Sequence, residues 1–139
     1  MKPYVACILL LMPTALQAKP FLIITGAKSS LTNASEDDIQ RLYLGRSTSV
    51  NNADVAPVDY DDANELSQDF REKILKKNSV QYRQYWARLL FTGRARPPVS
   101  SIKSEQEMIQ YVQANENSIG YISNEALAKN VKVLLKLGL

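Results

Sequence analysis

The sequence predicts an α/β domain built on a mostly parallel sheet of about four strands flanked by about five helices. Short apolar runs alternate along the chain with segments of helical spacing, which is typical of strands that alternate with helices. Several of the helical segments follow a Ser, a residue type that caps helix amino termini. The chain has 139 residues, of which 45% are apolar and 22% charged, so its composition indicates one globular domain.

Residues 1–18 have the pattern of a secretory signal peptide. Lys2 precedes an apolar run at 5–12, and the small residue Ala18 follows at a suitable cleavage position. The run is shorter than the ~20 residues that span a bilayer. We therefore expect cleavage after Ala18 and a single periplasmic domain over residues 19–139; the alternative is a buried amino-terminal helix. Cleavage would remove Cys7, the only cysteine, so the domain would fold without disulfides.

The first expected strand covers residues 21–25, an apolar run of the kind that is buried on both faces. A polar loop follows it, and Ser35 is expected to cap a helix over residues 36–44 that ends at Gly45. A strand, a loop and a capped helix are the start of a parallel α/β unit. This interpretation places the loop that contains Ser29 and Ser30 at the carboxyl end of the sheet, where ligands bind in open α/β folds.

The middle of the chain predicts a polar connection at 46–54, a short strand at 55–58 and an acidic loop at 59–65. Pro57 cannot donate to a strand ladder, which indicates a strand end or an edge. Leu66, Phe70 and Ile74 then repeat with helical spacing. Arg71, on this helix, is expected to form a surface ion pair with a nearby carboxylate.

A second helix is expected after Ser79, with an aromatic stripe that has the spacing of a core face rather than of a stacking platform. The stripe consists of Tyr82, Tyr85 and Trp86. The segment 91–98 is expected to end this helix and to be irregular beyond Gly93.

The last third of the chain predicts two strands and two helices. A Ser-x-x-Glu capping box at 104–107 precedes a helix, and residues 118–122 form a strand in which Gly120 allows close packing. A short helix at 123–129 and a final strand at 131–135 complete the expected order.

Four segments in this order resemble one protein family. They are Ile-Gln-Arg-Leu-Tyr-Leu-Gly-Arg at 39–46, Val-Ala-Pro-Val-Asp at 55–59, Tyr-Trp-Ala-Arg-Leu-Leu-Phe-Thr-Gly-Arg at 85–94 and Ser-Ile-Gly-Tyr-Ile at 118–122. Together they are similar to short solute-binding-protein-like domains related to the substrate-binding protein of the phosphate ABC transporter. The resemblance covers nearly all of residues 21–135. It implies a periplasmic-binding-protein-like lobe, a role in ion transport and phosphate or another small oxyanion as the ligand.

The chain departs from this family in two ways. Full-length members trap phosphate between two lobes, whereas 121 residues can form about one lobe. The phosphate loop of the family, rich in Ser, Gly and Thr, corresponds here to residues 59–65, which hold four carboxylates. Carboxylates oppose the attraction of a helix amino terminus for an anion. The alternative function is therefore a pocket-less module that docks on a membrane or envelope protein, such as a transporter.

The expected ligand-binding residues are Ser29, Ser30, Asp59 and Thr92. The two serines offer hydroxyl and backbone donors, and Asp59 at a strand end would accept a hydrogen from a protonated oxyanion; otherwise these residues form turns and caps. The basic segment around Thr92 would meet an anion or an acidic partner, or its arginines are simply solvated near the negative end of the helix dipole.

Composition argues against several other functions. The chain has no His and, after cleavage, no Cys, which removes the usual general base, nucleophile and metal ligands, so neither an enzyme nor a cofactor site is expected. Clustered carboxylates at 59–62 match no known metal loop. The net charge of +3 is too small for nucleic-acid binding.

Overall fold

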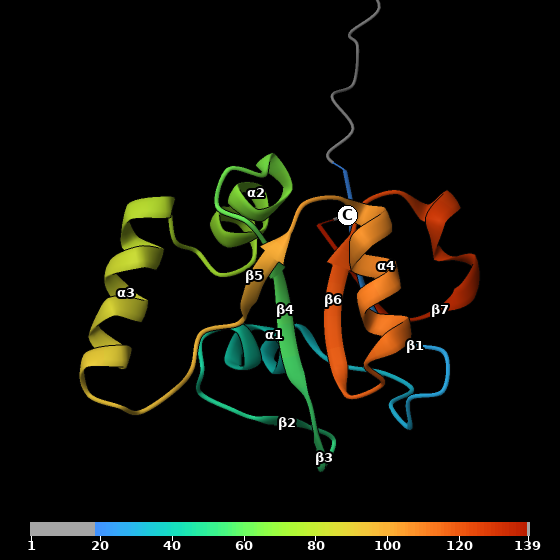
Figure 1. Cartoon of the computed structure of the whole chain (residues 1–139), viewed down its shortest axis with the longest axis horizontal. Coiled ribbons are helices and arrows are strands. Elements are labelled where there is room, and N and C mark those ends of the chain that lie inside the picture. Colours follow the sequence, from blue (N-terminus) through green and yellow to red (C-terminus); the bar gives the residue numbers. More distant parts are fainter. Residues whose placement is uncertain (1–18, 139) are drawn as a thin grey trace, which may run out of the picture.

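A five-stranded mixed sheet forms the centre of the molecule, in a computed structural model that describes residues 19–138 (Figure 1). The expected signal peptide at 1–18 lies outside the described residues. The sheet has the strand order β5-β4-β6-β1-β7. Its strands are β1 Phe21–Gly26, β4 Ala56–Tyr60, β5 Val99–Ile102, β6 Ser118–Ile122 and β7 Val131–Leu137.

Four α-helices and one 3-10 helix surround this sheet, as the sequence predicts. They are α1 Glu36–Tyr43, α2 Glu65–Lys73, α3 Ser79–Phe91, α4 Glu105–Ala114 and the 3-10 helix η1 Glu125–Asn130. A small hairpin of β2 Ser49–Val50 and β3 Ala53–Asp54 lies within the segment expected to be a polar connection. Among the described residues, no helix has the length and apolarity to cross a bilayer.

The direction of β1 differs from the expectation. β4 runs parallel to both β5 and β6, but β1 pairs antiparallel with β6 and β7, so β1 is the one reversed strand. Thr25, near the end of β1, pairs with Ile119 near the start of β6. The loop after β1 therefore lies at the amino end of β4, β5 and β6, and its expected position at their carboxyl end is wrong.

Most of the expected elements are present, with shifted boundaries. β6 covers the expected residues 118–122, while the strand expected at 55–58 extends to Tyr60 and so includes Asp59. β5 is an unexpected fifth strand, directly after the segment expected to be irregular. Asn78, not Ser79, caps α3, because the Asn78 side chain accepts a hydrogen bond from the Gln81 backbone.

Side chains from both faces of β6 show how the layers pack. Gly120 faces α4, because a Cβ there would lie 2.3 Å from the sulfur of buried Met108. On the next residue, Tyr121 stacks on Phe70 of α2 at 3.9 Å between ring centroids and meets Tyr43 of α1 edge-on. Thus α4 covers one face of the sheet, and α1 and α2 cover the other.

Helix α3 packs less deeply than the other helices and projects beyond the β5 edge of the sheet (Figure 1). Of its 13 residues, only Tyr82 and Trp86 are buried, and Tyr85 is half-buried, which confirms the core role of the stripe. Trp86 packs against Gly45, where a Cβ would lie 2.7 Å from the indole ring. Gly45 also has a φ of +68°, the left-handed conformation that lets a glycine end a helix.

Candidate functional site

A buried carboxylate lies at the carboxyl end of β4, where parallel strands of an α/β sheet present their ligands. Asp59 is fully buried, because β4 extends to Tyr60, into the predicted acidic loop, and turns this side chain towards α2. Its carboxylate accepts hydrogen bonds from the Tyr60 backbone at 2.8 Å and from the Tyr121 hydroxyl. A buried charge needs such partners, since an unpaired one costs several kcal/mol.

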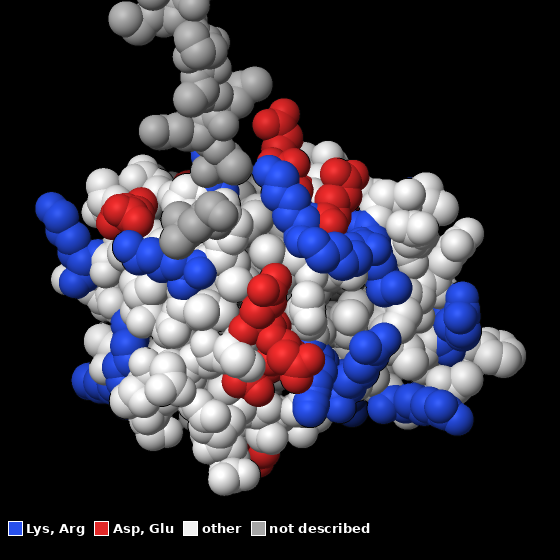
Figure 2. Space-filling view, turned by 180° about the vertical axis from the view of Figure 1, so that it is seen from behind, with Lys and Arg blue, Asp and Glu red and all other residues white. Residues whose placement is uncertain are grey.

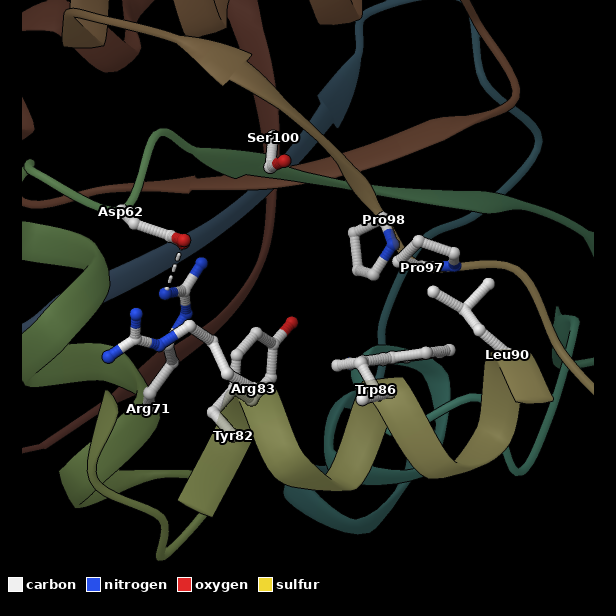
Figure 3. Close-up of a pocket in the computed structure, with 10 residues that line it drawn as sticks. Asp62, Arg71, Tyr82, Arg83, Trp86, Leu90, Pro97, Pro98 and Ser100 are labelled. Atoms are coloured by element: carbon white, nitrogen blue, oxygen red, sulfur yellow. Dashed lines mark hydrogen bonds and ion pairs between the residues drawn. The ribbon is translucent and has the colours of Figure 1, made fainter. Parts of the chain in front are cut away.

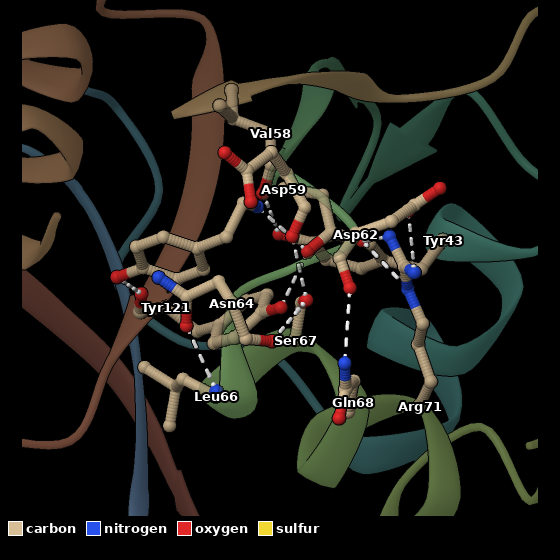
Figure 4. Close-up of polar contacts among 12 residues, drawn as sticks. Tyr43, Val58, Asp59, Asp62, Asn64, Leu66, Ser67, Gln68, Arg71 and Tyr121 are labelled. Atoms are coloured by element: carbon tan, nitrogen blue, oxygen red, sulfur yellow. Dashed lines mark hydrogen bonds and ion pairs between the residues drawn. The ribbon is translucent and has the colours of Figure 1, made fainter. Parts of the chain in front are cut away.

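The main partner of Asp59 is Arg71 of α2, and Figure 4 shows the contacts. Arg71 donates to Asp59 Oδ2 from Nη2 at 3.1 Å and from Nε at 3.4 Å. It also donates from Nη1 to Asp62 Oδ1 at 2.7 Å. The Arg71 side chain is 2% exposed, whereas that of Asp62 is 64% exposed. The ion pair of Arg71 with a nearby carboxylate is confirmed, but its expected surface position is wrong.

Burial and charge act in opposite directions on this pair. Burial raises the pKa of the Asp59 carboxyl, although Arg71 and the Tyr121 hydroxyl oppose that shift. Burial alone would lower the pKa of Arg71, but the attraction of Asp59 and the hydrogen bond to Asp62 raise it overall. The guanidinium also lies over the Tyr82 ring, 4.2 Å from its centroid. Arg71 therefore stays charged, and the two aspartates offset its charge.

The carboxylates of the acidic loop repel one another less than the sequence suggests, because Asp59, Asp61 and Asp62 each accept a hydrogen bond from a partner within the protein. Asp59 and Asp62 share Arg71, and Asp61 Oδ1 accepts from the Ala63 backbone in a turn. Glu65 lies in the first turn of α2, where the helix dipole favours it. Within residues 19–138, no group of three or more carboxylates is arranged to hold a metal ion.

Next to this network lies a groove between α3 and the segment before β5, with a volume of about 270 Å³. Figure 3 shows Trp86 and Leu90 of α3 facing Pro97 and Pro98, which form the apolar end of the groove. The polar end is lined by Asp62, Arg71, Tyr82, Arg83 and Ser100. Arg83 has no carboxylate partner within 4.0 Å among the described residues.

A second depression, of about 390 Å³, lies over the amino termini of α2 and α4. Its charged lining consists of Lys19, Glu65, Asp69 and Glu105, three carboxylates against one ammonium. The Glu105 carboxylate accepts hydrogen bonds from the backbone N–H groups of Ser123 and Asn124, so these donors are not available to an anion. The groove beside α3 is lined by two guanidiniums and one carboxylate, with Asp59 paired to Arg71 beneath it, so its surroundings are less acidic than those of this depression and charge favours it for an anion.

The structure does not bring the four expected binding residues together. Asp59 lies beneath the groove, whereas Ser29 and Ser30 follow β1 at the opposite end of the sheet. Ser29 Oγ accepts from the Leu31 backbone, as in an ordinary turn. Thr92 is exposed at the end of α3 and donates to the Leu89 carbonyl at 3.0 Å. This contact is that of a residue at the end of a helix and not that of a ligand-binding residue.

Arg83 and Ser100 were not expected as site residues. Arg83 lies three residues before Trp86 on a helix whose aromatic stripe was expected to face the core, and Ser100 lies in the unexpected strand β5. The charge of Arg83 was visible in the sequence. What was missing was the position of β5, because its pairing with β4 is a long-range contact.

Comparisons with known proteins agree on the fold. No protein-family model matches the chain, and no curated protein matches it. A putative phosphate ABC transporter substrate-binding protein from Clostridium perfringens, solved with bound phosphate, superposes with a TM-score of 0.62 and 20% identity, over 82% of this chain and 43% of that one.

Two further solved structures are similar. An ABC-type phosphate transport receptor from Vibrio cholerae gives a TM-score of 0.61 and 16% identity, over 89% of this chain and 52% of that one. PstS from Borrelia burgdorferi gives a TM-score of 0.59 and 17% identity, over 82% of this chain and 46% of that one. The chain therefore has the fold of part of these substrate-binding proteins, as the resemblance implied, and it spans about half the length of these structures.

Proposed function

We propose that this chain is an exported, solute-binding-like protein without catalytic activity that holds a small oxyanion, such as phosphate, in the groove beside α3. The observation that supports this proposal is the pair of guanidiniums, Arg71 and Arg83, that line one groove at the carboxyl end of β4. Arginines bind phosphate through paired, charge-assisted hydrogen bonds. The similar structures are phosphate transport proteins, which makes phosphate the first ligand to test.

In this proposal each lining residue has a defined role. Arg83 contributes the charge that no carboxylate offsets among the described residues, and Ser100 contributes a hydroxyl donor. Asp59 acts as a positioning residue, because it holds Arg71 through two hydrogen bonds without lining the groove. Asp62 accepts a hydrogen bond from the hydroxyl of a protonated phosphate. Sulfate has no such hydroxyl at neutral pH.

Binding is expected to be weak. Asp62 already occupies one nitrogen of Arg71 at 2.7 Å, so an anion must displace or share that carboxylate. The Arg71 side chain is 2% exposed and that of Asp62 is 64% exposed, so this ion pair is partly buried and its displacement opposes anion binding. The groove is also open on one side in a chain that spans about half the length of the similar structures.

The test is a calorimetric titration of residues 19–139 with phosphate, with sulfate as the control anion. Saturable binding that Arg83→Gln weakens at least about tenfold supports the proposal, since a charged hydrogen bond contributes roughly 1.5–3 kcal/mol. Arg94→Gln is the matched control, because it removes the same charge at an exposed position outside the groove. Asp62→Asn should shift preference from phosphate towards sulfate.

Two outcomes would contradict the groove. No heat up to millimolar phosphate would exclude a useful oxyanion site. Binding that is lost in Ser29→Ala or Ser30→Ala but kept in Arg83→Gln would place the ligand in the loop after β1, at the other end of the sheet.

A further inference from the structure

One continuous part of the chain combines basic charge with exposed apolar side chains. Residues 73–103, called here the basic segment, contain eight Lys or Arg residues and no Asp or Glu. The remaining nine basic residues of the chain share the rest of the sequence with all 14 acidic residues. The right side of Figure 2, where α3 lies, shows Lys and Arg beside uncharged surface. The basic charge of this protein is thus concentrated around α3.

The exposed apolar groups lie in the same segment. Among the described residues, all the large hydrophobic side chains that are exposed belong to it: Val80 at 54%, Leu90 at 53%, Phe91 at 95% and Val99 at 42%. A single exposed apolar residue needs no explanation, but four within 20 residues of sequence form a candidate contact surface. Phe91 is the most notable, since nearly all of its ring is in water.

Helical spacing places two of them, Val80 and Phe91, on the outer side of α3, whereas Leu90 faces the groove and Val99 lies in β5. Val80, Gln84, Ala87 and Phe91 follow one another at intervals of four, three and four residues and form a stripe opposite the buried Tyr82 and Trp86. Arg83 borders this stripe on one side and Arg88 on the other, and both are exposed. Exposed apolar side chains on an uncharged stripe between cationic side chains are typical of helices that lie in the interface of an anionic membrane.

The basic groups are also free to contact a partner. None of the basic residues between 73 and 103 forms an ion pair within the part of the chain that the structure describes. Beyond Phe91, Gly93 turns the chain with a φ of +67° and nothing lies within 4 Å of its missing Cβ, and the exposed Arg94 and Arg96 follow. The end of α3 is therefore a projecting apolar ring surrounded by arginines.

We infer that the outer face of α3 and the turn after it bind the surface of an anionic phospholipid membrane, with Phe91 inserted among the lipids. A second copy of this chain fits less well, because pairing two such stripes would bring Arg83 and Arg88 against arginines of the other copy. An acidic protein would satisfy the charges, but Phe91 projects into solvent rather than lining a shaped groove. A membrane needs only charge and a projecting apolar group.

The experiment is co-sedimentation of residues 19–139 with vesicles of phosphatidylglycerol and phosphatidylcholine, compared with vesicles of phosphatidylcholine alone. This part of the chain is suitable because residues 21–137 form the whole hydrophobic core of the described structure. We expect binding to the anionic vesicles only, and its loss at high salt. Phe91→Ser should reduce it about tenfold, because an apolar ring no longer leaves water.

The charge is tested by a matched pair of double variants. Arg88→Gln with Arg94→Gln should weaken binding by at least about tenfold, because each basic residue near an anionic surface contributes to the attraction. Lys28→Gln with Lys129→Gln removes the same charge from exposed positions near the β7 edge, opposite to β5, and should leave binding nearly unchanged. Equal losses in the two double variants would overturn the proposal.

Three other results would also overturn it: equal binding to both kinds of vesicle, a dimer in light scattering that Phe91→Ser dissociates, or binding to polyglutamate but not to vesicles. The dimer would assign the stripe to a second copy, and polyglutamate binding would assign it to an acidic protein.

The depth of residue 91 in the membrane is checked with Phe91→Trp. The fluorescence of the introduced tryptophan should be quenched by brominated lipid, while that of the native Trp86, 5% exposed, should not be. This inference does not depend on the oxyanion groove.

Discussion

The buried network at the end of β4 and the outer face of α3 use charge in opposite ways. In the network, Arg71 is 2% exposed and is held by Asp59 and Asp62, so the charges satisfy one another inside the protein. On α3, Arg88 is exposed and has no ion pair within the described residues. In the network, each buried charge is tolerated because its partner is in place, and losing either partner would destabilise the fold. The exposed arginine contributes little to folding and remains available to a ligand or a surface.

The sharpest difference between the regions is expected at alkaline pH. Burial raises the pKa of four tyrosines that surround the network, and Asp59 raises each of them further: Tyr43, Tyr60, Tyr82 and Tyr121. In the unfolded chain each titrates near its ordinary pKa of about 10. A folded pKa above the unfolded one contributes stability that is complete below about pH 10 and is lost as pH rises above it.

At about pH 11 each tyrosine should cost roughly 1.4 kcal/mol, so the four together should remove about 6 kcal/mol, close to the whole stability of a small domain. Circular dichroism and tyrosinate absorbance should therefore change together. Tyr82→Phe keeps the ring over which Arg71 lies and should reduce this dependence by about a quarter, as one of four groups. Tyrosinate absorbance that rises near pH 10 with the fold intact would contradict the burial of these hydroxyls.

The next largest effect is expected from removing one member of the buried ion pair. Arg71→Leu leaves Asp59 fully buried without its main partner, so the free energy of unfolding in urea should fall by about 4 kcal/mol. Arg83→Leu, at an exposed arginine of α3, should change it by no more than about 0.5 kcal/mol. The double variant Asp59→Leu with Arg71→Leu should recover most of the loss, because no buried charge remains unpaired.

Local sequence patterns predicted most elements of this fold but not the partners of its strands. The strand at 118–122 and the cap at Ser35 follow from a few adjacent residues, and both are present: Ser35 Oγ accepts from the Asp38 backbone at 3.1 Å. The direction of β1 depends on its pairing with β6 and β7, about 100 residues later in the chain. Nothing within residues 21–26 encodes that choice, so Ser29 and Ser30 were expected at the wrong end of the sheet.

The candidate site was only partly predictable for a related reason. Asp59 was identified from its place at the end of a strand, but its burial depends on Arg71, twelve residues later on α2. An aspartate in a run of acidic residues has the same local pattern whether it is solvated or paired. The groove could not be predicted, because it exists only where β5 brings Pro97 and Ser100 beside α3.

The smallest of these effects separates the two faces of α3 itself. Trp86 is 5% exposed and anchors α3 to the body of the protein against Gly45, whereas Phe91 is 95% exposed at the other face. Trp86→Ala should therefore lower the free energy of unfolding by about 3 kcal/mol, the cost of a large buried aromatic, while Phe91→Ala should leave it within about 0.5 kcal/mol of the parent. Chemical denaturation of the two variants measures both values. A clear loss of stability in Phe91→Ala would mean that this ring packs within the folded chain in solution. The ring would then not be available to a membrane, and the proposed insertion would be wrong. If instead only Trp86→Ala destabilises the protein, the exposed ring does not stabilise the fold, and its function must be sought outside the chain.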